Sequence, residues 1–108
     1  MFTIDENNKI KVIQGDTGIF ELALENHMLS AGDKVYFTVK KDYNSQPLIK
    51  KVVTEFTDGK AKFILTSSDT NIDANIYLYD VQCSLADGRI DTIIKPSKFQ
   101  VLGGITND

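Results

Sequence analysis

The sequence predicts a single all-β domain built as a two-sheet sandwich of about eight strands. Three observations lead to this prediction: apolar and polar residues alternate in short runs, Gly, Asp and Asn separate the runs, and 108 residues suit one core. Alternation begins near Lys9 and ends at Gly103-Gly104, so we expect residues 1–108 to form one domain with an ordered core over about 9–102.

The first half of the chain predicts four strands. Lys9–Gln14 and Thr17–Leu24 alternate on either side of the turn Gly15-Asp16. After a loop that closes at Gly32-Asp33, the alternation of Val35, Phe37 and Val39 with polar residues is the cleanest in the chain. Leu48–Phe56 follows Pro47 and carries adjacent lysines, which are typical of an edge strand, and its blurred period suggests a bulge.

The second half predicts two hairpins and one long strand. Asp58-Gly59 and Asp87-Gly88 are strong hairpin signals, because Gly59 and Gly88 can take the positive φ that tight hairpin turns require. Asn75–Leu85 is the longest strand candidate, and its more apolar face is predicted to enter the core. The remaining predictions are a strand at Ala61–Leu65, at most one helical turn at Thr66–Asn71, and strands at Ile90–Lys95 and Lys98–Leu102, separated by Pro96.

Composition excludes several classes of function. The formal net charge is −3 and Arg89 is the one arginine, whereas a nucleic-acid binder would show a basic patch rich in arginine. The single cysteine, Cys83, cannot form an intramolecular disulfide, which favours folding in a reducing cytoplasm. The N-terminal residues show no signal peptide, and no apolar run is long enough to span a membrane. We therefore expect no nucleic-acid or membrane partner.

Residues that could carry chemistry have a simpler structural interpretation. His27 lies in a polar loop with no nucleophile motif beside it and is expected to be solvent-exposed, while Cys83 falls on the core face of its strand. The cluster Asp5–Asn8 lacks the spacing of a calcium loop, and Gly15–Gly18 lacks the lysine and helix of a phosphate loop. We expect no catalytic residue, no metal, no cofactor and no enzymatic activity.

The faces of the predicted strands suggest an interface. Ile19, Tyr36, Ile64 and Leu78 lie on the second face, which is more apolar than a fully solvated face needs to be, as do Ile93 and Leu102. These residues are candidates for contact with the other sheet's edge or with a partner subunit. Tyr77 is expected to be structural, because it stands at the start of the long strand, where sandwiches place a tyrosine corner.

A set of short strand and turn phrases resembles a known family. The phrases are Ile13–Thr17, Gly32–Lys40, Ser68–Thr70, Tyr77–Gln82, Asp87-Gly88 and Thr92–Phe99. In this order they resemble the N-terminal domain of tailed-phage upper baseplate proteins and related prophage tail components, over about Ile10–Leu102. Members of that family commonly continue into a coiled coil or further domains, whereas this sequence stops soon after Gly103-Gly104.

The resemblance implies an immunoglobulin-like antiparallel sandwich in the tail of a virion, made in the cytoplasm of the bacterial host. Its role would be that of an adaptor that docks into the baseplate and positions receptor-binding components. Expected partners are other tail or baseplate proteins, with a homo-oligomer as a further possibility. The alternative is a carbohydrate- or surface-binding module of a cell-envelope protein, for which Tyr36 and Tyr43 are the candidate aromatic residues, since the chain contains no tryptophan.

Overall fold

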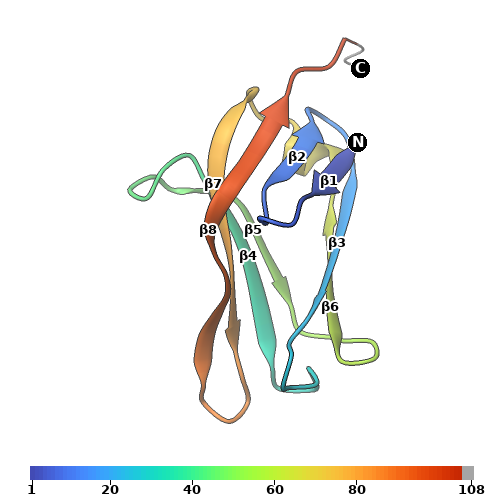
Figure 1. Ribbon diagram of the computed structural model, residues 1–108, viewed down its shortest axis with the longest axis vertical. Coiled ribbons are helices and arrows are strands. Elements are labelled where there is room, and N and C mark those ends of the chain that lie inside the picture. Colours follow the sequence, from blue (N-terminus) through green and yellow to red (C-terminus); the bar gives the residue numbers. More distant parts are fainter. Residues whose placement is uncertain (106–108) are drawn as a thin grey trace.

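The computed structural model describes residues 1–105, and these form eight strands and one short helix, so the fold is all-β (Figure 1). In chain order the elements are β1 (Phe2–Ile4), β2 (Ile10–Ile13), β3 (Gly18–Ala23), β4 (Lys34–Lys40), β5 (Pro47–Val53), β6 (Lys60–Leu65), α1 (Ser67–Thr70), β7 (Asn75–Ser84) and β8 (Ile90–Leu102). No helix among these residues is both long enough and apolar enough to cross a membrane.

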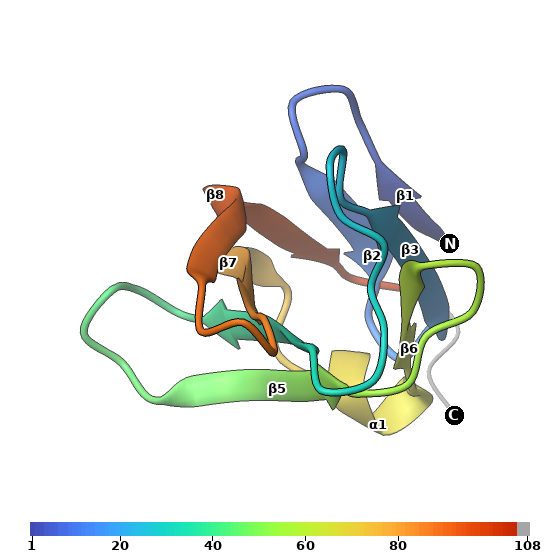
Figure 2. The ribbon, with the colours of Figure 1, turned by 90° about the horizontal axis from the view of Figure 1, so that it is seen from below.

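The strands form two sheets with the core between them. The larger sheet has the order β1-β2-β8-β7-β4-β5, and β3 pairs with β6 in the smaller sheet, which Figure 2 shows to one side of the larger one. Aromatic side chains join the two layers, because Phe37 of β4 lies 6.1 Å from Phe20 of β3 and 5.6 Å from Phe63 of β6, measured between ring centroids. The two sheets therefore share one hydrophobic core.

The two clearest alternations in the sequence give β4 and β7, neighbouring strands in the interior of the larger sheet. Val35, Phe37 and Val39 of β4 are completely buried, as predicted. Tyr77, Tyr79, Val81, Cys83 and Leu85, the predicted core face of the longest strand, are also buried. β5 lies at the edge of the sheet, and its register against β4 shifts between Val39 and Lys40. The predicted bulged edge strand is therefore confirmed, but it ends at Val53 rather than at Phe56.

The first strand, β1, was not among the predicted strands and adds the opposite edge of the larger sheet. β1 pairs antiparallel with β2, and the Asp5 carboxylate holds the turn between them by accepting hydrogen bonds from the backbone N–H groups of Asn7 and Lys9. Phe2 packs directly on Gly18 of β3, where any larger residue would displace the Phe2 ring. The ordered part of the chain thus begins before residue 9, and the polar cluster Asp5–Asn8 is a turn.

The prediction of two strands around Pro96 is wrong, because β8 runs unbroken from Ile90 to Leu102. The register between β7 and β8 shifts by one residue on each side of Val81, and these irregularities accommodate the proline without ending the strand. The C-terminal part of β8 pairs in parallel with β2, so the sheet is not antiparallel throughout. The final count of eight strands matches the prediction only because β1 replaces the strand lost at Pro96.

The Asp58-Gly59 turn forms, but it does not create the predicted hairpin of two paired strands. Both residues have positive φ, at 54° and 73°, and Thr57 and Lys60 exchange backbone hydrogen bonds across them. Beyond that single bridge the two segments that flank the turn diverge. β5 belongs to the larger sheet, and β6 pairs with β3. The turn therefore carries the chain from one sheet to the other.

The Asp87-Gly88 turn does join paired strands, β7 and β8, but in another conformation. Gly88 has a φ of 94°, whereas Asp87 is not in the positive region. Leu85 accepts from the Gly88 N–H and donates to the Arg89 carbonyl, which is the pattern of a three-residue loop with glycine in the left-handed position.

Comparing the two turn glycines gives a stability prediction. Ala at either position is strained by the positive φ, but a Cβ at Gly59 would also lie 3.2 Å from Cβ and 3.3 Å from Cα of Met28, whereas Gly88 faces open space. We expect Gly59→Ala to lower the free energy of unfolding by about 2 kcal/mol and Gly88→Ala by about 1 kcal/mol. Urea denaturation of both variants measures the difference, and equal losses would contradict a steric role for Met28.

Candidate interaction surfaces

The four predicted interface residues divide between two surfaces rather than forming one. Ile19 of β3 and Ile64 of β6 are directly opposite each other on the outer face of the smaller sheet, where they are 60% and 56% exposed. Tyr36 and Leu78 are partly buried on the outer face of the larger sheet. The core lies between these two faces, so one partner cannot bind both in the same way.

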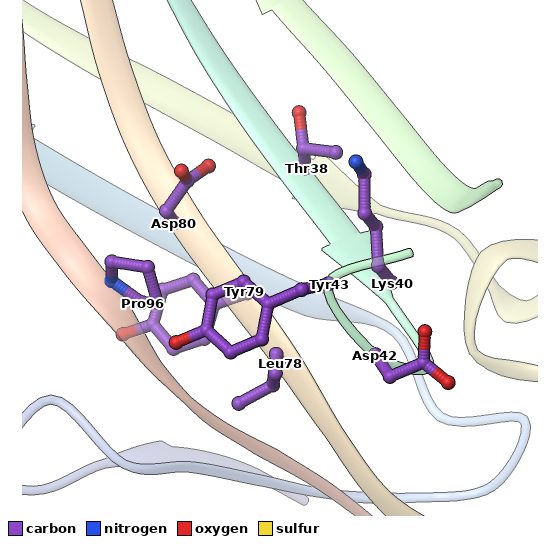
Figure 3. Close-up of a pocket in the computed structure, with 8 residues that line it drawn as sticks. All are labelled: Thr38, Lys40, Asp42, Tyr43, Leu78, Tyr79, Asp80 and Pro96. Atoms are coloured by element: carbon purple, nitrogen blue, oxygen red, sulfur yellow. The ribbon is translucent and has the colours of Figure 1, made fainter. Parts of the chain in front are cut away.

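A small hollow lies on the outer face of the larger sheet, beside the β4–β5 hairpin (Figure 3). Its volume is about 100 Å³, below the roughly 300 Å³ of the smallest usual ligand pockets. Tyr43 extends from the hairpin over β7 toward Pro96. In this view Thr38 and Asp80 lie above the Tyr43 ring. The complete lining is Thr38, Lys40, Asp42, Tyr43, Leu78, Tyr79, Asp80 and Pro96. A hollow of this size fits one side chain, whereas a sugar ring would lie only partly inside it.

The hairpin that presents Tyr43 is held by its own hydrogen bonds. The Asp42 carboxylate accepts from the Asn44 N–H at 2.9 Å, and the Ser45 hydroxyl both accepts from the Asp42 N–H and donates to the Asp42 carbonyl. These local bonds order the loop, and they leave the Tyr43 side chain 71% exposed. Leu48, the unpaired residue of the β5 bulge, is 48% exposed on the same hairpin.

We call Tyr43, Leu48, Leu78 and the lining of the hollow the hairpin surface. Exposed tyrosine on an ordered loop is the kind of residue that dominates binding energy in protein interfaces, because it adds a large contact area at low conformational cost. The sequence pointed to Tyr43 and Leu78 separately. It could not place them side by side, since that depends on β4 and β7 being neighbours.

At the opposite end of the molecule, a groove separates the β3–β4 loop from the β7–β8 hairpin. It is lined by Ala23, Leu24, Glu25, Asn26, His27, Leu85, Arg89, Ile90, Asp91, Thr92 and Ile93. Of these residues, His27 belongs to a polar group centred on Asp33, which is 2% exposed. The Asp33 carboxylate accepts from the backbone N–H groups of Ser30 and Ala86 at 3.0 and 2.8 Å, and its Oδ2 is 2.8 Å from His27 Nε2.

This arrangement corrects the prediction that His27 is a solvent-exposed loop residue. The His27 side chain is only 27% exposed, because its ring bonds to the buried carboxylate. The hydrogen bond from Ala86, followed by those from His27 and Ser30, lowers the pKa of Asp33 to about 2. The Asp33 carboxylate thus remains charged and joins the β3–β4 loop to the β7–β8 hairpin.

The other residues considered for chemistry have structural surroundings. Cys83 is completely buried, and burial raises the pKa of its thiol, which disfavours the reactive thiolate. In the Gly15–Gly18 segment, the Asp16 carbonyl accepts from the Thr70 hydroxyl at 2.6 Å. Residues 1–105 contain no group of three or more His, Cys, Asp or Glu side chains arranged to hold a metal ion.

The three residues that the sequence predicts to be structural, Tyr77, Gly59 and Gly88, lie at turns and connections between strands. The Tyr77 hydroxyl donates to the carbonyl of Asp73, four residues upstream, at 2.5 Å. This is the contact that defines a tyrosine corner, and it anchors the connection between α1 and β7. Gly59 and Gly88 occupy the two turns described above.

The chain matches no protein-family model and shows no significant similarity to a curated protein.

Proposed function

We propose that the fold is an immunoglobulin-like sandwich. In such folds the strand pair B and E faces a sheet that contains G, F, C and C′. Here β3 and β6 form a pair that faces the order β8-β7-β4-β5, and this order supports the assignment, with β1 and β2 extending the larger sheet beyond β8. The hydrogen bond from Tyr77 to Asp73, at the start of the strand equivalent to F, also supports this assignment.

Within this fold, we propose that the protein is a structural adaptor of a phage or prophage tail, which docks through the hairpin surface onto other tail or baseplate proteins. The observation that carries the proposal is the ordered β4–β5 hairpin with Tyr43 71% exposed beside a hollow that fits one side chain. His27 bonds to Asp33 and Cys83 is buried, so these two side chains have structural roles, which favours a binding function over catalysis. The proposed location in the tail rests on the resemblance of the sequence to baseplate domains.

The test of location is mass spectrometry of tail particles. Particles would be purified after induction of a bacterial strain that carries this sequence, and the chain quantified against a known tail protein. We expect the chain in a fixed ratio to that protein through successive purification steps. Loss of the chain from intact particles during purification would contradict a structural role in the tail.

The docking surface can be tested in the same particles. We expect Tyr43→Ala to reduce incorporation of the chain at least roughly fivefold, because truncation of a central interface tyrosine commonly costs more than about 1 kcal/mol of binding. Ile90→Ala is the matched control, since Ile90 is 70% exposed at the opposite end of the molecule. Equal incorporation of both variants would show that the hairpin surface is not the docking site.

The second candidate function is carbohydrate binding, and the composition of the hollow favours it. One exposed aromatic ring, Tyr43, adjoins two carboxylates, Asp42 and Asp80, and this combination can stack on a sugar and accept hydrogen bonds from its hydroxyls. Tyr36, the other aromatic candidate, is partly buried in the middle of β4 and is not part of the hollow. Calorimetric titration with soluble cell-wall polysaccharides separates the two functions, since only a carbohydrate module would give binding that Tyr43→Ala abolishes.

A further inference from the structure

The outer face of the smaller sheet has an ordered pattern of side chains. Going along the sheet from Gly18 and Leu65, the first outward row is Ile19 opposite Ile64, and the next is Glu21 opposite Lys62. The first row is apolar and more than half exposed, and the second pairs an acid with a base. β3 and β6 are both six residues long, and their inward residues Phe20 and Phe63 face the core.

We propose that this face is a two-fold contact between two copies of the chain. Consider a second copy facing the first, related by a two-fold axis that runs parallel to the strands and midway between β3 and β6. The rotation exchanges β3 and β6 while keeping each row at its own level along the axis. Ile19 then faces Ile64 of the second copy, and Glu21 faces Lys62 of the second copy.

The charge pattern is what selects a second copy as the occupant. Because the acid and the base of the second row stand directly opposite each other, the rotation places unlike charges together in two symmetric contacts. The apolar row supplies four isoleucines to the contact, and packing two faces with aligned strands is a usual geometry for β-sheets. An unrelated partner would need to supply both the apolar row and the matching charges.

The area of the face sets the strength of the contact. Strands of six residues are about 20 Å long, and two of them are about 10 Å wide, so the face covers roughly 200 Å² on each copy. A standard stable interface covers about 800 Å² on each partner. The contact is therefore weak for free molecules and becomes effective where copies are held at high local concentration.

Sedimentation equilibrium at low ionic strength, up to a chain concentration of about 1 mM, tests the proposal. We expect the mean mass to rise from that of a monomer toward that of a dimer. Ile64→Asp should abolish the rise, since it would place a charge in the apolar row. A chain that remains monomeric over the whole range, or a dimer that Ile64→Asp leaves unchanged, would overturn the proposal.

A charge exchange tests the orientation of the two copies. Glu21→Lys places lysine against lysine in both symmetric contacts and should raise the dissociation constant roughly tenfold. Lys62→Glu should do the same, and the double variant Glu21→Lys/Lys62→Glu should return it to near the original value. Glu6→Lys, in the exposed β1–β2 turn, is the control for net charge. Failure of the double variant to recover would overturn this two-fold arrangement.

Discussion

Asp33→Ala is expected to lower the melting temperature by roughly 10 °C, although Asp33 is a polar residue in a loop. Its carboxylate accepts hydrogen bonds from the backbone N–H groups of Ser30 and Ala86, and both bonds lie in a part-buried site. The shorter side chain of alanine would leave these two donors without a partner and would release His27. Circular dichroism during heating measures the change. Asp42→Ala is the matched control, because Asp42 makes a comparable bond to the Asn44 N–H in an exposed turn.

The stabilisation that Asp33 provides should also depend on pH. The pKa of its carboxyl is lowered from 3.8 to about 2 in the folded protein, so folding favours the charged form. The resulting stability is complete above about pH 4 and is lost as the pH falls through about 2. We expect urea midpoints of the wild-type protein to decline over this window more steeply than those of Asp33→Asn. Parallel declines would show that other carboxylates cause the acid sensitivity.

The role of Asp33 shows where sequence reasoning reaches its limit. The sequence predicts that Gly32-Asp33 closes a loop, because short polar residues next to glycine are typical of turns. The third partner of the carboxylate, Ala86, lies 53 residues further along the chain, and nothing in the local pattern connects the two. The polar loop predicts an exposed His27, whereas its ring bonds to Asp33, six residues further along, and is therefore partly buried.

Strand positions were predicted more successfully than sheet membership. Alternation identifies β4 and β7 because each buries one face against the core, and a period of two follows directly from that. Asp58-Gly59 predicts a hairpin, and its turn forms, but turn chemistry does not determine whether the flanking strands stay paired. Pro96 predicts a break between two strands, whereas the register shifts between β7 and β8 allow proline within one strand.

For the candidate surfaces too, the sequence predicts the residues better than their arrangement in space. The sequence predicts an interface at Ile19, Tyr36, Ile64 and Leu78, because contiguous apolar side chains on an outer face often mark a binding site. The sequence could not show that Ile19 and Ile64 are cross-strand neighbours while Leu78 lies across the molecule beside Tyr43. The sequence indicates which exposed apolar residues are candidates for an interface. Which of these residues share one surface depends on which strands pair.

Phe37→Ala is expected to reduce the free energy of unfolding by about 3–5 kcal/mol, the usual cost of deleting a large aromatic side chain from a core. Phe37 is completely buried, and its ring centroid lies between 5.4 and 6.2 Å from those of Phe20, Phe63, Tyr79 and Phe99. It is the residue through which aromatic rings of both sheets meet. Urea denaturation followed by fluorescence and by circular dichroism gives the free energy directly.

Two variants show whether this loss of stability arises from the packing of aromatic rings between the two sheets. Phe37→Leu keeps most of the volume and should recover more than half of the loss, because volume-conserving changes in a core usually cost less than about 1.5 kcal/mol. Tyr36→Ala removes the neighbouring side chain, which lies on the outer face, and should cost less than about 1 kcal/mol. Domains of this size have a total stability of about 5–15 kcal/mol, so Phe37→Ala alone removes a large share of it. A loss for Tyr36→Ala as large as that for Phe37→Ala would mean that the outer face, and not the layer of aromatic rings, holds β4 in place.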